Sequence, residues 1–267
     1  MKENNDTIIG TTANGVSYLV VPPRGDAASV PVVIAWHLLD PPRTEAAFRA
    51  AISLDGLDAW KVYLGLPMSG SRTPAGGQDE MMAKLGTDAP GLVHGPIHSA
   101  AADEFPAALE DLRSRFGFGA DATVALVGGS MGAAVAAEII ARGTSGAAAA
   151  VLLSPLLQLR PMIDAVAPQF GGYEWTPEGA EAAERLDYLA RAGELSGVPI
   201  RIVVGADDLQ AIVQSAREVA EATGADLHVI DGMAHALAEE PGLEPAAQTE
   251  QAREADALAV EWLAAHL

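Results

Sequence analysis

Short β-branched apolar runs alternate with longer alanine-rich stretches along nearly the whole chain, and no other feature constrains the fold as strongly. Runs such as VPVVIAW and TVALV have the length of buried strands, whereas the stretches between them are long enough for helices. Strands alternating with helices are typical of βαβ units around a mostly parallel sheet. We therefore expect an α/β fold in which helices flank both faces of a central sheet of about eight strands.

The start of the chain and one long central segment depart from this alternation. Asn14 and Gly15 separate two apolar runs and indicate a two-residue hairpin, so the sheet should begin antiparallel. Residues 66–97 are dense in Gly, Pro, Ser and Thr, which predicts a long loop with one short helix around residues 79–85. The predicted strands are residues 7–12, 16–21, 30–36, 60–65, 123–127, 148–153, 199–204 and 226–230, and the predicted main helices are residues 45–52, 101–116, 131–142, 210–223 and 249–266.

Length and hydrophobic content predict one domain. A chain of 267 residues that is 49% hydrophobic can bury one large core, so we expect residues 1–267 to form a single domain. The first residues are polar and lack the apolar segment of an export signal, and no apolar stretch is long enough for a bilayer. We expect no membrane partner and a cytoplasmic protein, with a mature secreted form left open. The sequence does not decide between a monomer and a homodimer.

Charge and cysteine content exclude several function classes. The net charge of −20 repels phosphate backbones, so nucleic acid is not an expected partner. The absence of cysteine excludes disulfides, thiolate metal sites and a cysteine nucleophile. We expect no cofactor and no metal.

A G-x-S-x-G pattern, GGSMG at residues 128–132, lies between a predicted strand and a predicted helix. A serine on such a tight turn exposes its hydroxyl, and the crowded backbone tolerates only small residues two positions before and after it. The N-terminus of the following helix would also stabilise a developing oxyanion there. The pattern therefore predicts that Ser130 is a nucleophile.

A nucleophilic serine needs a base that is oriented by a third group. His235 follows the predicted strand 226–230, at the strand end where catalytic groups gather in open α/β sheets, so it is the candidate base. His228 within that strand and His266 at the terminus are expected to be structural. His94 and His98 are four residues apart, but Gly95 and Pro96 between them argue against the helix that would pair them on a metal.

The orienting acid should follow a strand in the same way. Asp207 and Asp208 both come after the run PIRIVV, and the residues themselves do not decide between them. Whichever of the two is not the acid would cap a helix or face solvent.

The chain order serine, acid, histidine resembles that of the α/β-hydrolase superfamily, over about residues 7–267. In size and motif order the chain is similar to serine esterases of the carboxylesterase, dienelactone-hydrolase and prolyl-oligopeptidase types, although dienelactone hydrolases usually carry cysteine at the nucleophile position and prolyl oligopeptidases usually add a propeller domain. In that superfamily the acid commonly closes a G-x-x-D stretch and the base a G-x-x-H stretch. The stretches at residues 205–208 and 232–235 are similar to both, so the resemblance favours Asp208 over Asp207.

The oxyanion hole needs two backbone N–H donors, one of them from the residue after the nucleophile, Met131. By resemblance the other donor comes from the loop His37-Leu38-Leu39-Asp40, where Leu39 aligns with the donor and Leu38 replaces a usual glycine. Because leucine does not readily enter positive φ, Leu38 stays an alternative donor. His37 would brace this loop or pack in the core.

The resemblance also implies a lid and an activity. Residues 155–197 stand where many relatives insert a lid, and Tyr173 and Trp175 within them are candidates for the substrate pocket, together with His37 and Leu38. The expected function is hydrolysis of carboxylic esters of a small or medium apolar substrate through an acyl-enzyme. Amide, peptide or thioester hydrolysis and acyl transfer with the same triad remain open, as does a non-catalytic binding protein on this fold.

Overall fold

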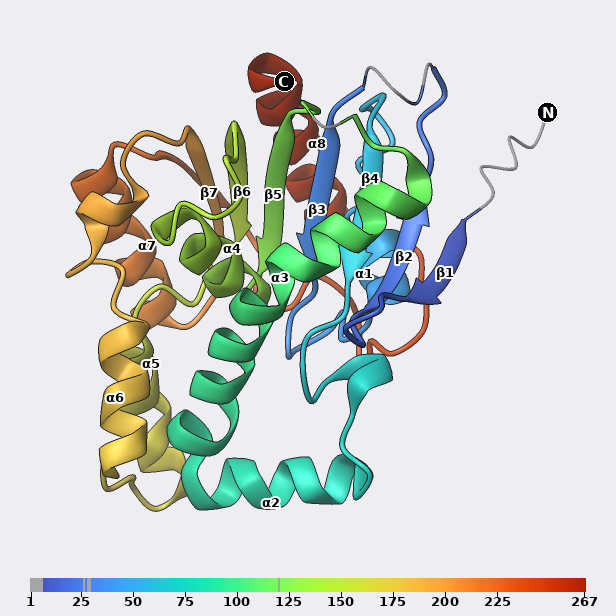
Figure 1. Ribbon diagram of the computed structural model, residues 1–267. Coiled ribbons are helices and arrows are strands. Elements are labelled where there is room, and N and C mark those ends of the chain that lie inside the picture. The colour runs from blue at the N-terminus through green and yellow to red at the C-terminus, as the bar shows by residue number, and fades with distance from the viewer. Residues whose placement is uncertain (1–6, 26, 28–29, 120) are drawn as a thin grey trace.

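The computed structural model describes residues 7–25, 27, 30–119 and 121–267, and a single eight-stranded sheet runs through its centre (Figure 1). The strand order is β1-β2-β4-β3-β5-β6-β7-β8, with β1, β2 and β4 paired antiparallel and all later neighbours paired parallel. The antiparallel start and the parallel remainder confirm the predicted α/β fold class. The strands are β1 (Ile8–Thr11), β2 (Ser17–Val21), β3 (Val32–Trp36), β4 (Trp60–Leu64), β5 (Val124–Gly129), β6 (Ala149–Leu153), β7 (Ile200–Gly205) and β8 (Asp226–Ile230).

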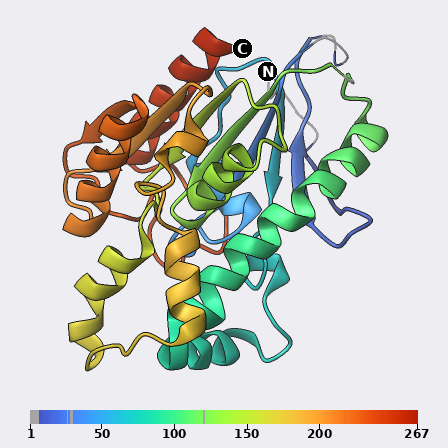
Figure 2. The ribbon, with the colours of Figure 1, turned by 60° about the vertical axis from the view of Figure 1, so that its left-hand side comes forward.

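Helices cover both faces of the sheet, so the parallel strands are buried on both sides. Helices α1 and α8 lie on one face, and α3, α4 and α7 lie on the other (Figures 1 and 2). Buried side chains of the two groups belong to separate hydrophobic clusters. This explains why the strands read as continuous apolar runs rather than as alternating ones. The bounds are α1 (Glu45–Ala51), α3 (Gly95–Phe116), α4 (Met131–Ala141), α7 (Gln210–Thr223) and α8 (Glu250–His266).

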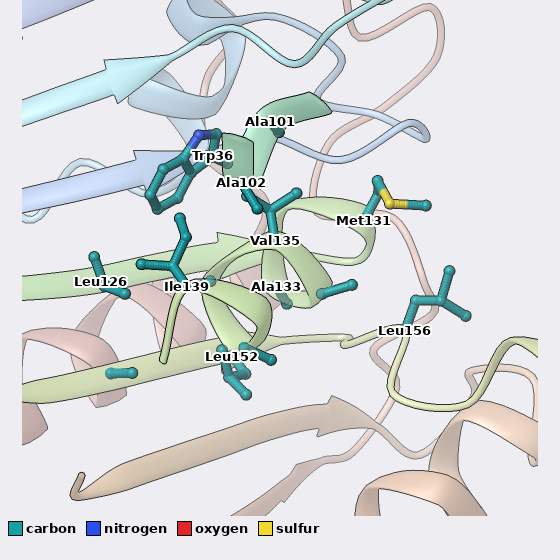
Figure 3. Packing of buried hydrophobic residues seen from close by; sticks show 14 of the residues in the cluster. Trp36, Ala101, Ala102, Leu126, Met131, Ala133, Val135, Ile139, Leu152 and Leu156 are labelled. Carbon is teal, nitrogen blue, oxygen red and sulfur yellow. The ribbon is translucent and has the colours of Figure 1, made fainter. Parts of the chain in front are cut away.

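Small side chains let α4 lie deep in the protein. Figure 3 shows Val135 of α4 facing Ala101 and Ala102 of α3, with Ile139 near Leu126 of β5. All five side chains are almost fully buried. Close packing of this kind fixes α4, and therefore the turn that precedes it, relative to the sheet.

The segment predicted as a long loop is largely helical, so that prediction was wrong. Residues 77–94 form α2 (Gly77–Ala89) and a wide π turn, η2 (Pro90–His94), which leads directly into α3. Pro96 lies in the first turn of α3, directly after the π turn. Several glycines and prolines of this segment lie at helix ends, among them Gly77, Pro90 and Gly95.

The second departure lies in the predicted lid, residues 155–197. A helix that the sequence did not predict, α5 (Leu159–Val166), begins there and tolerates Pro161 in its first turn. The sequence also indicates helical stretches after Thr176 and around residues 186–192. The first is α6 (Pro177–Arg185), whereas residues 186–191 form turns and an isolated bridge before the short 3-10 turn η4 (Ala192–Leu195).

The helices α2, α5 and α6 lie together beyond one edge of the sheet, below the strands in Figure 1. We call residues 77–94 and 159–185, which contain these helices and η2, the cap. The cap thus comes from two separate segments, of which the sequence predicted only the second. No helix in the described part of the chain combines the length and apolar character needed to cross a membrane.

Candidate active site

Ser130 sits on a sharp turn between β5 and α4. Its backbone has φ 47° and ψ −109°, a conformation that L-residues rarely adopt. The flanking glycines permit this turn, because a Cβ on Gly128 would lie 2.2 Å from the carbonyl oxygen of Gly132, and one on Gly132 would lie 2.4 Å from that of Trp36. A strained residue held by such close backbone contacts is characteristic of functional turns.

Gly132→Ala is expected to destabilise the protein by about 3 kcal/mol, because backbone atoms cannot give way as a flexible side chain would. Chemical denaturation with urea measures the loss. Gly193→Ala is the matched control, since nothing lies within 4 Å of its Cβ position. Equal stability of the two variants would contradict the packing argument.

A continuous hydrogen-bonded chain joins the hydroxyl of Ser130 to the carboxylate of Asp208 through the imidazole of His235. Ser130 Oγ lies 2.8 Å from His235 Nε2, and His235 Nδ1 lies 3.0 Å from both oxygens of Asp208. The three residues come from the ends of β5, β7 and β8, which meet at one edge of the sheet. Because a carboxylate only accepts, Nδ1 must donate to Asp208, which leaves Nε2 to accept the serine proton.

Asp207 and Asp208 have different surroundings. The side chain of Asp208 is fully buried, and its Oδ1 also accepts a hydrogen bond from the backbone N–H of Leu209 at 2.6 Å. Asp207 is exposed and makes no side-chain hydrogen bond to His235 among the described residues. The structure therefore brings Asp208, not Asp207, to the histidine.

The electrostatics around His235 favour its protonated form. Burial opposes a charge on the ring, but the hydrogen bond and the negative charge of Asp208, together with the charge of Asp40, raise the pKa of His235 above its ordinary value. Asp40 Oδ2 lies 3.8 Å from His235 Nε2, on the nitrogen that faces Ser130. The sequence did not single out Asp40, because its proximity to His235 arises only in the fold.

Two backbone N–H groups near Ser130 have no partner among the described residues. These belong to Met131, the first residue of α4, and to Leu39, and both residues line the same cavity as Ser130. The N–H of Leu38 is instead donated to the carbonyl oxygen of Pro42 at 3.3 Å. Leu39 and Met131 are therefore the N–H donors that remain available here.

His37 holds the peptide between Leu38 and Leu39 in place. Its ring is fully buried, its Nδ1 lies 2.7 Å from the carbonyl oxygen of Leu38, and its Nε2 accepts the N–H of Leu66 at 3.2 Å. Burial lowers the pKa of His37, so the ring is neutral and Nδ1 carries the proton. In a trans peptide the C=O and N–H point in opposite directions, so anchoring the carbonyl of Leu38 also directs the N–H of Leu39.

Comparison with known proteins identifies the fold. The sequence matches no protein-family model and no curated protein. The Thermus thermophilus protein TT1662 matches with a TM-score of 0.66 and 20% identity, covering 96% of this chain and 97% of that one. A dienelactone hydrolase from Anabaena variabilis matches with a TM-score of 0.59 and 17% identity, covering 98% of this chain and 97% of that one. This chain has the α/β-hydrolase fold.

A third neighbour is larger than this chain. A Mycobacterium tuberculosis puromycin-hydrolysing peptidase matches with a TM-score of 0.66 and 15% identity over 98% of this chain, but over only 39% of its own length. The same fold thus occurs in proteins that differ in size and in the activity they are named for.

Between the sheet edge and the cap of this α/β-hydrolase fold lies a cavity of about 760 Å³ that contains the side chains of Ser130 and His235. Both cap segments and the sheet-edge loops contribute to its wall, which is mainly apolar. Its apolar lining includes Leu39, Met82, Leu85, Met131, Leu156, Met162, Ile163, Val166, Phe170, Leu209 and Ile212.

The structure corrects three of the predicted pocket residues. His37 and Leu38, in the loop that follows β3, are fully buried and do not line the cavity. Trp175 does not line it either, because its ring stacks under the guanidinium of Arg160 at 3.9 Å and its N–H is donated to Asp164. Tyr173 does line the cavity. The predicted pocket residues were therefore wrong except for Tyr173.

One buried carboxylate ties the two cap segments together. Asp88 is the penultimate residue of α2. Its carboxylate accepts hydrogen bonds from the hydroxyl of Tyr173 at 2.6 Å, from the hydroxyl of Thr176 at 2.7 Å and from the N–H of Gly91 at 2.8 Å. Burial alone would raise the pKa of Asp88, but these hydrogen bonds outweigh it and lower the pKa below its ordinary value. The α-helical dihedrals break at this residue, with φ −158° and ψ 81°.

Asp88→Ala is expected to lower the free energy of unfolding by about 2 kcal/mol, because it leaves two hydroxyls and one N–H without their acceptor. Urea denaturation measures the loss, and hydrogen exchange should show faster opening of residues 77–94. Asp79→Ala, which removes an exposed carboxylate from the same helix, should cost less than about 1 kcal/mol. Similar losses of stability in the two variants would contradict the role of Asp88 as the anchor that joins the two cap segments.

The remaining histidines have structural partners. His94 Nδ1 bonds the carbonyl of Ala89, His98 Nε2 lies 2.8 Å from the hydroxyl of Tyr188, and His228 Nε2 lies 3.1 Å from Asp226. Within the described ranges, no three side chains of His, Asp or Glu gather in a way that would hold a metal ion.

Proposed function

We propose that this protein is a serine hydrolase that cleaves carboxylic ester bonds of small or medium apolar substrates through an acyl-enzyme intermediate. The observation that carries the proposal is the hydrogen-bonded chain from Asp208 through His235 to Ser130, which opens into an apolar cavity. A hydroxyl paired with a base that is itself oriented by a carboxylate is the arrangement that activates a serine nucleophile.

In the first half of the reaction, Ser130 Oγ attacks the ester carbonyl carbon while His235 Nε2 takes the hydroxyl proton. Asp208 stabilises the imidazolium that forms. The carbonyl electron pair moves onto oxygen, and the N–H groups of Met131 and Leu39 would stabilise this oxyanion. The oxyanion then collapses, the bond to the alcohol oxygen breaks, and His235 returns the proton to the departing alcohol. An acyl group remains on Ser130.

In the second half, water attacks the acyl carbon and gives its proton to His235. The second tetrahedral oxyanion uses the same two donors. When it collapses, the bond to Ser130 Oγ breaks and the serine recovers its proton from His235. The carboxylic acid leaves, and the site returns to its starting state.

The character of the cavity supports an ester with an apolar part. About 760 Å³ of mainly apolar space accommodates an acyl chain or alcohol of small to medium size. One structural neighbour is named a dienelactone hydrolase, and a lactone is a cyclic ester. Another is named a puromycin-hydrolysing peptidase, so peptide or amide hydrolysis is the second candidate. Thioester cleavage and acyl transfer would use the same residues.

Labelling with a fluorophosphonate probe tests the nucleophile. The intact chain should be labelled and Ser130→Ala should not, whereas Ser154→Ala, which removes another buried hydroxyl at a neighbouring strand end, should still be labelled. Equal labelling of the intact chain and Ser130→Ala would overturn the assignment. A chain that is never labelled would favour the non-catalytic alternative.

On the acidic side of the pH profile, the change in kcat/KM should reflect the ionisation of His235. Because the base must be neutral, kcat/KM should rise with pH through a pKa above the ordinary histidine value, since Asp208 and Asp40 raise it. Asp40→Asn removes one of these charges and should shift this rise to lower pH. Initial rates across the pH range measure both curves, and an unshifted rise would show that Asp40 does not act on His235.

A further inference from the structure

The polar side chains that line the cavity outside the triad present hydrogen-bond acceptors. Thr87 donates its hydroxyl to the carbonyl of Ala83 at 2.8 Å, and Tyr173 donates its hydroxyl to Asp88 at 2.6 Å. Each hydroxyl has then used its only proton, so lone pairs alone remain to face a ligand. No lysine or arginine is among the cavity residues in the described part of the chain.

His94 adds another acceptor to the same wall. Its Nδ1 lies 2.9 Å from the carbonyl oxygen of Ala89, which can only accept, so Nδ1 carries the ring proton. Burial lowers the pKa of His94, although the backbone hydrogen bond and the charges of Asp40 and Asp88 oppose this effect. The neutral ring leaves Nε2 as an acceptor, and His94 is among the residues that line the cavity.

Two carboxylates other than Asp208 complete this lining, and Asp40 is the one beside the reacting atoms. It follows Leu39 directly and lies 3.8 Å from His235 Nε2. Its side chain is 53% exposed and has no lysine or arginine partner among the described residues, because the nearby Arg43 is paired with Glu240 at 2.6 Å. Asp207 is the other carboxylate, and it is also exposed.

The carboxylate of Asp40 favours the imidazolium of His235, but with no lysine or arginine beside it the same charge disfavours an oxyanion formed on a neutral substrate. The oxyanion proposed to form at the N–H of Leu39 would develop next to the negative charge of Asp40, and like charges repel. A positive charge on the substrate would offset that repulsion and would also satisfy the acceptors of the wall. A substrate carboxylate would add to the repulsion.

We infer that the substrate carries a protonated amine, or an equivalent cationic hydrogen-bond donor, close to the scissile bond, and that Asp40 receives it. This inference rests on the proposed function and narrows its substrate class to amino-bearing esters. Asp40 is then a residue that determines specificity, with His94 and Asp207 as further acceptors.

Two isosteric pairs of esters test the inference. Dimethylaminoethyl butyrate and isopentyl butyrate differ by an ammonium in the alcohol, and alanine ethyl ester and ethyl isobutyrate differ by one in the acyl group. At neutral pH the wild-type chain should prefer the ammonium member of at least one pair by about fivefold or more in kcat/KM. Asp40→Asn should abolish the preference.

Asp121→Asn is the matched control, because it removes the same charge from an exposed loop that precedes β5, at the opposite end of that strand from Ser130. It should keep the preference of the wild-type chain. Equal rates on both members of both pairs, or a preference that survives Asp40→Asn, would overturn the inference while leaving the proposed hydrolase intact. A chain that cleaves neither member and is not labelled at Ser130 would overturn both.

Discussion

His235→Ala is expected to lower kcat for ester hydrolysis by about 10⁴-fold or more. Without the imidazole, Ser130 keeps its proton at neutral pH and the leaving alcohol has no acid to protonate it. The loss should appear in kcat rather than in KM, because His235 acts on the transition state and the apolar cavity still binds the substrate. Initial rates with an aryl butyrate measure both parameters.

His228→Ala serves as the control for His235→Ala. His228 lies on β8, only a few residues before His235, but its Nε2 faces Asp226 rather than Ser130. Its removal should leave kcat within about twofold, as expected for a surface substitution away from the site. A large loss of kcat in His228→Ala, or a small loss of kcat in His235→Ala, would contradict the assignment of His235 as the general base.

Asp208→Asn should lower kcat by about 10⁴-fold, whereas Asp207→Asn should change it by less than about threefold. An asparagine at 208 can present its amide hydrogens to His235 Nδ1, which favours the tautomer that carries the proton on Nε2 and cannot accept from Ser130. Asp207 is exposed, and its side chain is not hydrogen-bonded to the imidazole.

The two aspartate variants control for each other, since they are adjacent and make the same chemical change. Circular dichroism and thermal unfolding should show that both fold. Comparable losses of kcat in the two would mean that the orientation of His235 does not depend on the buried carboxylate.

Much of the fold could be predicted because strands that are buried on both faces of the sheet have a recognisable apolar sequence. The parallel strands are covered on both faces, so they appear as continuous apolar runs such as residues 199–204. The hairpin at Asn14 and Gly15 also left a local signal, and β1 and β2 pair antiparallel on either side of it. Both signals depend on neighbouring residues alone.

The cap could not be predicted in the same way. The helices α5 and α6 are short, and Pro161 stands in the first turn of α5, where proline is tolerated but resembles a helix breaker in the sequence. The anchor at Asp88 depends on Tyr173 and Thr176, which are far away in the chain. Contacts between distant segments leave no periodic pattern to find.

The candidate site was likewise predictable only where its residues follow a local sequence signal. Ser130, Asp208 and His235 each follow a strand, so the sequence placed them near one another from chain order and strand ends. The choice between Leu38 and Leu39 needed the structure, because it depends on which N–H is already donated to Pro42. The pocket residues and Asp40 also needed it, since a cavity wall is assembled from several segments.

The sheet-edge loops hold Ser130, Asp208 and His235, whereas the cap supplies most of the apolar wall of the cavity. The protein is therefore modular. Lengthening, shortening or replacing residues 77–94 and 159–185 would change which substrates the proposed hydrolase accepts, while Ser130, Asp208 and His235 stay on the sheet-edge loops. Diversification of such a protein, in nature or in the laboratory, therefore has an obvious place to begin, and it lies outside the central sheet.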